Sequence, residues 1–152
     1  MKILFLCYGN ICRSPLAEGI FADLVAKQKR PISCDSAGTA NYHIGSLPYE
    51  GSRLVAQKYG LTLTHRGRQL QREDIENFDY ILAMDRNTLQ TAENLAKQVI
   101  NPTAKIRLFR AFDSEKGNLE VPDPYGRGAK EFEECYQTLL RCCKGFLEYL
   151  ET

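Results

Sequence analysis

The sequence predicts a three-layer α/β fold, in which a four-stranded parallel sheet is flanked by helices in a flavodoxin-like or Rossmann-like arrangement. Short apolar segments alternate with longer segments whose apolar residues recur every three or four positions, which is typical of βα units. Two of the short segments, Lys2 to Cys7 and Tyr80 to Met84, are nearly continuous in apolar residues, as expected for strands that are buried on both faces. With 152 residues, no internal repeat and no linker, the chain is expected to form one domain over residues 1–152.

Composition argues against several classes of function. The net charge of +1 gives no electrostatic reason to expect nucleic acid or a membrane surface as a partner, and no segment approaches the roughly 18 apolar residues of a membrane span. The six cysteines do not form a disulfide pattern, so we expect reduced thiols and a cytoplasmic protein. Two histidines and no Cys-x-x-Cys pair argue against a metal site, and no cofactor is expected.

The first predicted strand runs from Lys2 to Cys7 and is almost entirely apolar. A helix follows, with Ser14 as the expected N-cap and Pro15 in the first turn, and it ends near Lys27. Residues Ile32 to Ser36 read as a second short strand. The loop between the first strand and the helix therefore lies at the carboxyl end of a strand, where parallel α/β sheets bind their ligands.

The middle of the chain adds a helix, a single helical turn, a strand and a further helix. Residues Tyr49 to Tyr59 have apolar residues at helical spacing, and Gly60 is the expected C-cap. One helical turn is expected between Asp74 and Phe78. Residues Tyr80 to Met84 form a third buried strand, and a helix follows over Asp85 to Val99.

The last part of the chain contains a fourth strand, a long polar segment and the longest helix. The strand is expected over Ile106 to Phe109. The segment Arg110 to Gly128 is polar and rich in Gly, Pro and Asp, and irregular segments of this length in compact domains are usually functional. The helix is expected from Ala129 to Leu150, where apolar residues recur in steps of three and four.

The loop Cys7-Tyr-Gly-Asn-Ile-Cys-Arg-Ser consists of residue types that bind a tetrahedral oxyanion. Backbone N–H groups of the loop and of the helix N-terminus favour an anion, and Arg13 offers a planar pair of donors. This positive environment, together with the hydroxyl of Ser14, favours the thiolate form of Cys7. Gly9 is expected to allow close backbone approach and an unusual conformation, and Asn10 to tolerate a left-handed turn.

Four segments of the chain closely resemble the low-molecular-weight protein tyrosine phosphatases, in the order of that family. They are Cys7 to Glu18, Asp35 to Gly38, Asp79 to Asp85 and Val121 to Tyr125. The resemblance implies the fold of that family, the phosphotyrosine phosphatase I type. It also implies metal-independent hydrolysis of phosphotyrosine and small aryl phosphates through a cysteinyl-phosphate intermediate.

The resemblance implies a role for each residue of the site. Cys7 would be the nucleophile, Arg13 the phosphate clamp, and Asp123 the general acid and then the general base. A two-step transfer through a covalent intermediate does need one group that gives and later takes a proton. The remaining residues of the implied phosphate-binding loop are Tyr8, Gly9, Asn10, Ile11, Cys12 and Ser14.

Further residues are implied to support the loop, to wall its entrance or to regulate it. The implied supporting residues are Asn10, Ser14, Ser36 and His65, and the implied entrance residues are Tyr8, Tyr42 and Tyr125. Gly126 stands where the family often has a second tyrosine, which leaves part of that wall open. Cys12 is implied to form a reversible disulfide with Cys7 under peroxide, which spares the nucleophile from further oxidation.

Three other functions fit parts of this pattern. Arsenate reductases with the same loop need two relay cysteines, but Cys135 and Cys142 are seven residues apart on one predicted helix, hence about 10 Å apart and beyond disulfide reach. Phosphoarginine phosphatases have a threonine where Ile11 stands, and an apolar side chain suits an aryl ring better. A phosphotyrosine-binding module without activity is opposed by the intact set of nucleophile, clamp and acid.

The expected partners follow from the phosphatase interpretation. They are phosphotyrosine proteins, with a bacterial tyrosine kinase as one partner by family analogy, and inhibitory oxyanions such as phosphate and vanadate. The chain is expected to be a monomer or a weak dimer.

Overall fold

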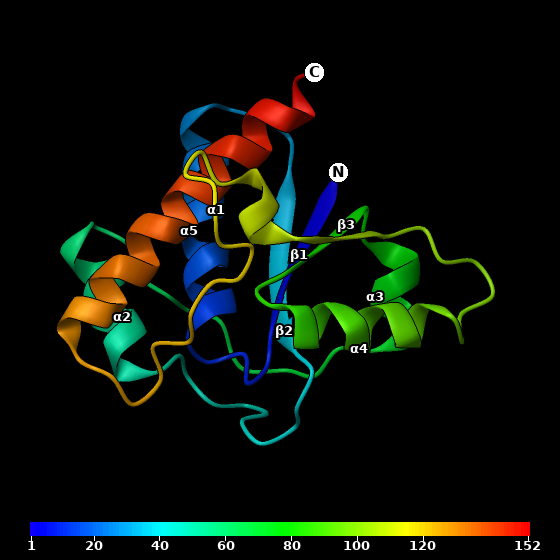
Figure 1. The fold of residues 1–152 in the computed structure, drawn as a ribbon, viewed down its shortest axis with the longest axis horizontal. Coiled ribbons are helices and arrows are strands. Elements are labelled where there is room, and N and C mark those ends of the chain that lie inside the picture. The colour runs from blue at the N-terminus through cyan, green and yellow to red at the C-terminus, as the bar shows by residue number, and fades with distance from the viewer.

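The computed structural model describes all residues from Met1 to Thr152 and has three layers, with a parallel sheet between two layers of helices (Figure 1). Strands β1 (Lys2–Cys7), β2 (Ser33–Gly38), β3 (Tyr80–Ala83) and β4 (Lys105–Leu108) pair in the order β2-β1-β3-β4. All three pairings are parallel. The predicted α/β fold is therefore confirmed, and β1 is an inner strand of the sheet.

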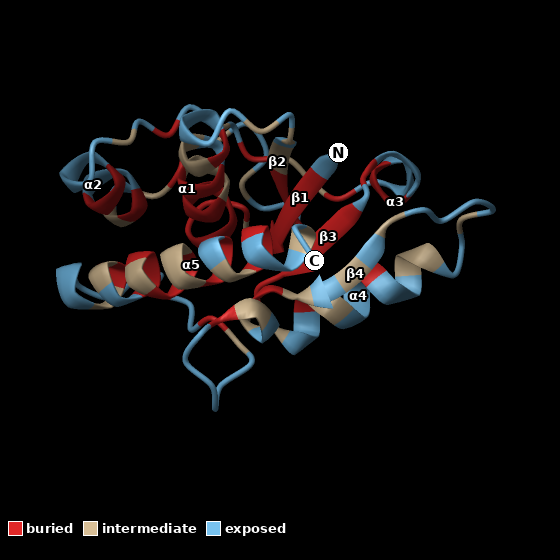
Figure 2. Cartoon of the chain, turned by 90° about the horizontal axis from the view of Figure 1, so that it is seen from above, coloured by how far each residue is buried: buried red, intermediate tan, exposed pale blue.

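The helices divide between the two faces of the sheet. Helices α1 (Arg13–Lys27), α2 (Glu50–Lys58) and α5 (Ala129–Leu150) lie on one side, while α3 (Arg72–Asn77) and α4 (Arg86–Ala96) lie on the other (Figure 1). Alternate side chains of β1 enter two separate apolar clusters because side chains alternate along a strand. Figure 2 shows the buried strands β1 and β3 between the two helical layers. None of these helices is both long and apolar enough to cross a membrane.

The predicted start of the first helix is wrong. Helix α1 begins at Arg13 with Cys12 in the N-cap position, and no side chain caps it. The hydroxyl of Ser14, the expected cap, instead lies 3.0 Å from the sulfur of Cys7 and accepts a hydrogen bond from the amide of Asn10 at 2.8 Å. Because Ser14 faces the loop, the N–H groups of the first turn of α1 have no side-chain partner and remain available to an anion.

Other element boundaries differ by a few residues from those predicted. The second strand extends to Gly38 because that residue pairs with Cys7 in the parallel ladder. The fourth strand stops at Leu108, and the chain turns into a 3₁₀ helix over Phe109–Phe112. The predicted C-cap glycine, Gly60, has the expected positive φ of 80°.

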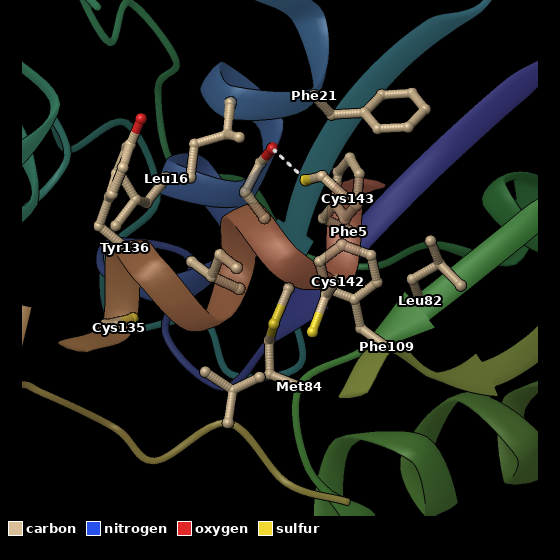
Figure 3. Close-up of a cluster of buried hydrophobic side chains, with 14 of the residues drawn as sticks. Phe5, Leu16, Phe21, Leu82, Met84, Phe109, Cys135, Tyr136, Cys142 and Cys143 are labelled. Atoms are coloured by element: carbon tan, nitrogen blue, oxygen red, sulfur yellow. Dashed lines mark hydrogen bonds between the residues drawn. The ribbon is translucent and has the colours of Figure 1, made fainter. Parts of the chain in front are cut away.

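The cysteines of α5 belong to the core. Cys135, Cys142 and Cys143 are buried, and Cys142 and Cys143 lie among the aromatic side chains of the larger apolar cluster (Figure 3). All six cysteines of the chain are free thiols. Helix α5 is unbroken from Ala129 to Leu150, so the spacing argument against a relay disulfide between Cys135 and Cys142 holds.

Candidate active site

The phosphate-loop segment packs closely against the end of β2. A Cβ atom at Gly38 would lie 2.8 Å from the carbonyl oxygen of Tyr8 and 3.1 Å from the backbone nitrogen of Asn10, so this position needs a glycine. Asn10 has a φ of 56°, in the left-handed region that asparagine tolerates. Gly9 has no positive φ, and the nearest atom to a Cβ placed there is 3.4 Å away. The unusual conformation expected at Gly9 therefore belongs to Asn10.

The thiol of Cys7 lies at the floor of this loop and is surrounded by donors. Its sulfur is 3.0 Å from the Ser14 hydroxyl and accepts a hydrogen bond from the backbone N–H of Asn10 at 3.2 Å. The residue is only 2% exposed. Together with the uncapped N-terminus of α1, these donors form a polar environment that suits a sulfur anion and a second anion above it.

Arg13 is held by only part of its guanidinium group. Its Nη1 donates to the Asp85 carboxylate and to the carbonyl oxygen of Val121, both at 2.9 Å, and its Nη2 lies 3.8 Å from the Asp123 carboxylate. Burial lowers its pKa, but the charges of Cys7, Asp123 and Asp85 outweigh burial and raise the pKa of Arg13. Its Nε is the only buried side-chain nitrogen or oxygen without a hydrogen-bond partner. The edge formed by Nε and Nη2 is therefore free to bind an oxyanion.

Asp85 was not assigned a role from the sequence, although it follows the strand next to β1. One carboxylate oxygen accepts from the backbone N–H of Thr88 at 2.9 Å and caps α4, while the other binds Arg13. Burial opposes ionisation, but the Thr88 hydrogen bonds and the Arg13 charge lower the pKa of Asp85. Its position at the carboxyl end of a neighbouring parallel strand was the signal that could have identified it.

Asn10 joins the loop to its surroundings. Its amide nitrogen donates to the hydroxyls of Ser14 and Ser36, at 2.8 and 3.1 Å. Its amide oxygen lies 2.7 Å from Nε2 of His65 and accepts from the backbone N–H of Arg68 at 2.9 Å. Two of the residues implied as supports, Ser36 and His65, thus contact the loop through Asn10.

Two carboxylates lie behind His65 and were not assigned as site residues from the sequence. Its Nδ1 is 3.2 Å from a carboxylate oxygen of Glu18 and 3.3 Å from one of Asp35, so both ring nitrogens face oxygen atoms. Burial raises the pKa of Glu18. Burial opposes ionisation of Asp35, but hydrogen bonds from His65 and Ser36 lower its pKa. Ligand atoms of these three residues lie within 4.8 Å of one another, but the hydrogen bonds already engage them as a support for the loop.

A cavity of about 310 Å³ lies above the loop. Its lining residues are Cys7, Tyr8, Gly9, Ile11, Cys12, Arg13, His43, Asp123 and Tyr125. Tyr42, expected at the entrance, does not line it: this residue is 71% exposed, and its ring lies 6.1 Å from that of Tyr8. His43 was missed because nothing in its polar loop distinguishes it from a surface histidine. Burial raises the pKa of Cys12 above its ordinary range.

The chain is similar to known proteins over nearly its whole length. A family model described as low molecular weight phosphotyrosine protein phosphatase matches residues 2–152. A phosphatase of that name from Gallus gallus is 43% identical, with 97% of this chain and 94% of the relative covered. The low molecular weight protein-tyrosine-phosphatase YfkJ of Bacillus subtilis is 36% identical, with 99% and 96% covered. The crystal structure of DARP, a drosophila arginine phosphatase, has a TM-score of 0.96 and 35% identity, with 100% and 99% covered. The chain therefore belongs to the low molecular weight phosphotyrosine protein phosphatase family, a family of hydrolases.

Proposed function

We propose that this chain hydrolyses phosphotyrosine in proteins through a cysteinyl-phosphate intermediate. Cys7 is the nucleophile, Arg13 binds the phosphate, and Asp123 is the general acid and then the general base. The substrates are phosphoproteins, a bacterial tyrosine kinase among them by family analogy, and phosphate and vanadate are competitive inhibitors.

One observation carries this proposal. The single buried side-chain polar atom without a partner is Nε of Arg13, on the edge of the guanidinium group opposite the contacts with Asp85 and Val121. Leaving a buried donor unsatisfied costs about 1–3 kcal/mol. An oxyanion that accepts from Nε and Nη2 removes that cost and lies in the same cavity as Cys7. This arrangement supports a phosphate group bound directly over a thiol.

The proposed reaction has two steps. In the first, the Cys7 sulfur attacks phosphorus, the bond to the tyrosine oxygen breaks, and Asp123 gives its proton to that oxygen. In the second, Asp123 takes a proton from water, the water oxygen attacks phosphorus, and the phosphorus–sulfur bond breaks to release phosphate. Asp123 suits proton transfer because its side chain is half exposed and lies at the mouth of the cavity, with one oxygen held by the N–H of Tyr125 at 3.1 Å. The positive charge of Arg13 stabilises the negative charge on the phosphoryl oxygens in both steps.

The experiment is the release of phosphate from para-nitrophenyl phosphate and from a phosphotyrosine peptide in the presence of EDTA. Cys7→Ser is expected to abolish turnover, and Asp123→Asn to lower kcat by roughly 10²–10⁴-fold, the usual size of an acid–base contribution. Matched controls are Cys34→Ser, whose thiol only donates to a backbone carbonyl, and Asp23→Asn, a partly exposed residue of α1 that pairs with Lys27. Turnover by Cys7→Ser near that of the parent would refute the nucleophile, and a parent that binds phosphotyrosine without releasing phosphate would be a binding module.

Phosphoarginine is the second candidate substrate, because the arginine phosphatase DARP superposes on this chain with a TM-score of 0.96. Ile11 bears on the choice: it lines the cavity and offers only apolar surface to the group that carries the phosphate. An apolar wall favours an aryl ring over a charged guanidinium group. Rates on phosphotyrosine and phosphoarginine peptides of the same sequence test the choice, and a higher kcat/KM on phosphoarginine would reverse it.

A further inference from the structure

A second cavity, larger than the one above Cys7, lies outside the candidate active site. A groove of about 630 Å³, twice the volume of the catalytic cavity, runs between α2 and the N-terminal end of α5, which lie side by side in Figures 1 and 2. Its apolar surface comes from Tyr49, Leu54, Val55, Ala129 and Phe132. Leu54 is 56% exposed, although the helical spacing of α2 leads one to expect an inward-facing residue.

The groove is apolar because two helices approach each other through a glycine. A Cβ atom at Gly51 would lie 2.4–2.7 Å from three ring atoms of Phe132, so the ring lies directly against the backbone of α2. No side chain at position 51 covers the ring on this side. The aromatic floor of the groove is therefore packed directly against the backbone of α2.

A row of three aromatic rings connects the groove to the catalytic cavity. Tyr125 lines that cavity, and its ring centroid is 4.9 Å from that of Tyr49, which in turn stacks on Phe132 at 5.7 Å. The backbone N–H of Tyr49 also donates to the carbonyl oxygen of Ile11 at 2.7 Å, which ties the groove to the phosphate loop. At ~3.3 Å per residue, about three residues of extended peptide cover this aromatic row.

The charges at the groove favour an acidic ligand. Glu133 is neutralised by Lys58 at 2.5 Å. Arg127 forms no ion pair, and Lys130, which is 82% exposed, lies 4.0 Å from the exposed carboxylate of Glu134. Both basic residues line the groove and also a second cavity that includes Asp123, so they stand between the groove and the catalytic site. Glu50 is the one lining acid without a basic partner.

We propose that this groove binds the segment of a substrate protein that flanks its phosphotyrosine. An apolar side chain about three residues from the phosphotyrosine packs on Phe132 and Leu54, and an acidic residue beside it pairs with Arg127 and Lys130. The proposal rests on the proposed function, since the flanking segment is defined by the phosphotyrosine bound over Cys7. The groove thereby selects among phosphoproteins, whereas the catalytic cavity alone accepts any aryl phosphate.

The test compares a substrate without flanking residues with two phosphotyrosine peptides. The first peptide carries leucine and glutamate at the second and third positions on both sides of the phosphotyrosine, and the second carries alanine there. The parent protein is expected to prefer the first peptide by roughly tenfold in kcat/KM, mainly through KM, as for a modest apolar pocket. Leu54→Gln and Lys130→Glu each reduce this preference and leave turnover of para-nitrophenyl phosphate unchanged. Lys144→Glu, an exposed lysine near the far end of the same helix, changes neither.

Each other outcome overturns the proposal in a distinguishable way. Equal rates on the two peptides by an active parent would show that the groove does not contact substrate, and equal losses on peptide and para-nitrophenyl phosphate would show that the substitutions disturb the catalytic cavity. A parent inactive on para-nitrophenyl phosphate would remove the proposed function itself. A dimer seen by sedimentation that Leu54→Gln dissociates, with peptide rates unchanged, would assign the groove to a second copy of the chain.

Discussion

Replacing Asp85 by asparagine tests how far Arg13, the proposed phosphate-binding residue, depends on a single carboxylate. One oxygen of Asp85 caps α4 by accepting from Thr88, and the other holds Nη1 of Arg13 at 2.9 Å. Asparagine caps a helix about as well as aspartate, so Asp85→Asn keeps the first contact. In place of the second oxygen it presents an amide N–H group to the N–H of Arg13. The substitution therefore removes one contact and leaves the helix intact.

The size of the effect follows from that contact. A hydrogen bond to a charged group contributes about 1.5–3 kcal/mol, and each ~1.4 kcal/mol changes a rate tenfold. Because the carbonyl oxygen of Val121 still holds Nη1 at 2.9 Å, the guanidinium group is loosened rather than released. We expect kcat/KM for para-nitrophenyl phosphate to fall roughly 10- to 100-fold, and the inhibition constant of vanadate to rise in parallel.

The control is Thr88→Val, which has a similar shape and removes a hydroxyl that donates to Asp85 at 2.9 Å without touching Arg13. It is expected to lower the free energy of unfolding by about 1 kcal/mol and to leave kcat/KM within threefold of the parent. If Asp85→Asn kept full kcat/KM and vanadate affinity, the carbonyl of Val121 alone would suffice to position Arg13. The proposed dependence on Asp85 would then be wrong.

Two further predictions concern stability and oxidation. Asp113 is fully buried; burial disfavours its charge, but hydrogen bonds from Arg141 and Arg110 outweigh burial and lower the pKa of Asp113. A carboxylate with a lowered pKa in the folded protein stabilises the fold at pH values above the pKa of an aspartate in the unfolded chain, about 3.9. This stabilisation is lost as the pH falls below that value. Because Asp113→Asn breaks a buried ion pair, we expect it to lower the free energy of unfolding by roughly 3 kcal/mol at pH 7. Measured by urea unfolding, this loss should become progressively smaller below about pH 4. A loss that does not depend on pH would contradict an origin in the charge of Asp113. Mild peroxide should oxidise Cys7 to a sulfenic acid, which condenses with the Cys12 thiol to a disulfide with loss of water. Because dithiothreitol reduces this disulfide, it should restore the activity of the oxidised parent protein more fully than that of the oxidised Cys12→Ser variant. Mass spectrometry that finds no peptide linking the two residues would exclude this protection.

Local patterns were enough to predict the long elements. The helix from Ala129 to Leu150 has the predicted bounds because its apolar stripe continues over six turns, and the helix ends where this amphipathic pattern ends. The end of β2 was placed two residues early, since the strand extends as far as its partner, and Gly38 pairs with Cys7. That partner is distant in sequence, and no local propensity reports it.

The same distinction applies to the site. The loop residues were found because their chemistry lies in one short segment, and Asp123 came from the resemblance to a family. Asp85 and Glu18 were missed, because their roles depend on which residues the fold brings beside Arg13 and His65. Acidic residues are common after a strand, as at Asp85, and on a helix, as at Glu18. Only the contacts made in the folded protein distinguish these two residues from surface carboxylates.

The place of β1 inside the sheet has a consequence for biosynthesis. Translation produces Cys7 more than a hundred residues before Asp123, an interval on the order of ten seconds at usual elongation rates. For nearly all of that time the carbonyl of Val121, the Asp123 carboxylate and helix α5 (Ala129–Leu150) have not been made. The nascent chain therefore carries the cysteine without the complete set of groups that hold Arg13 or, in the proposed mechanism, supply a proton. Activity therefore begins only after the C-terminal half has folded against the first strand, and any product of premature termination before Val121 should lack it.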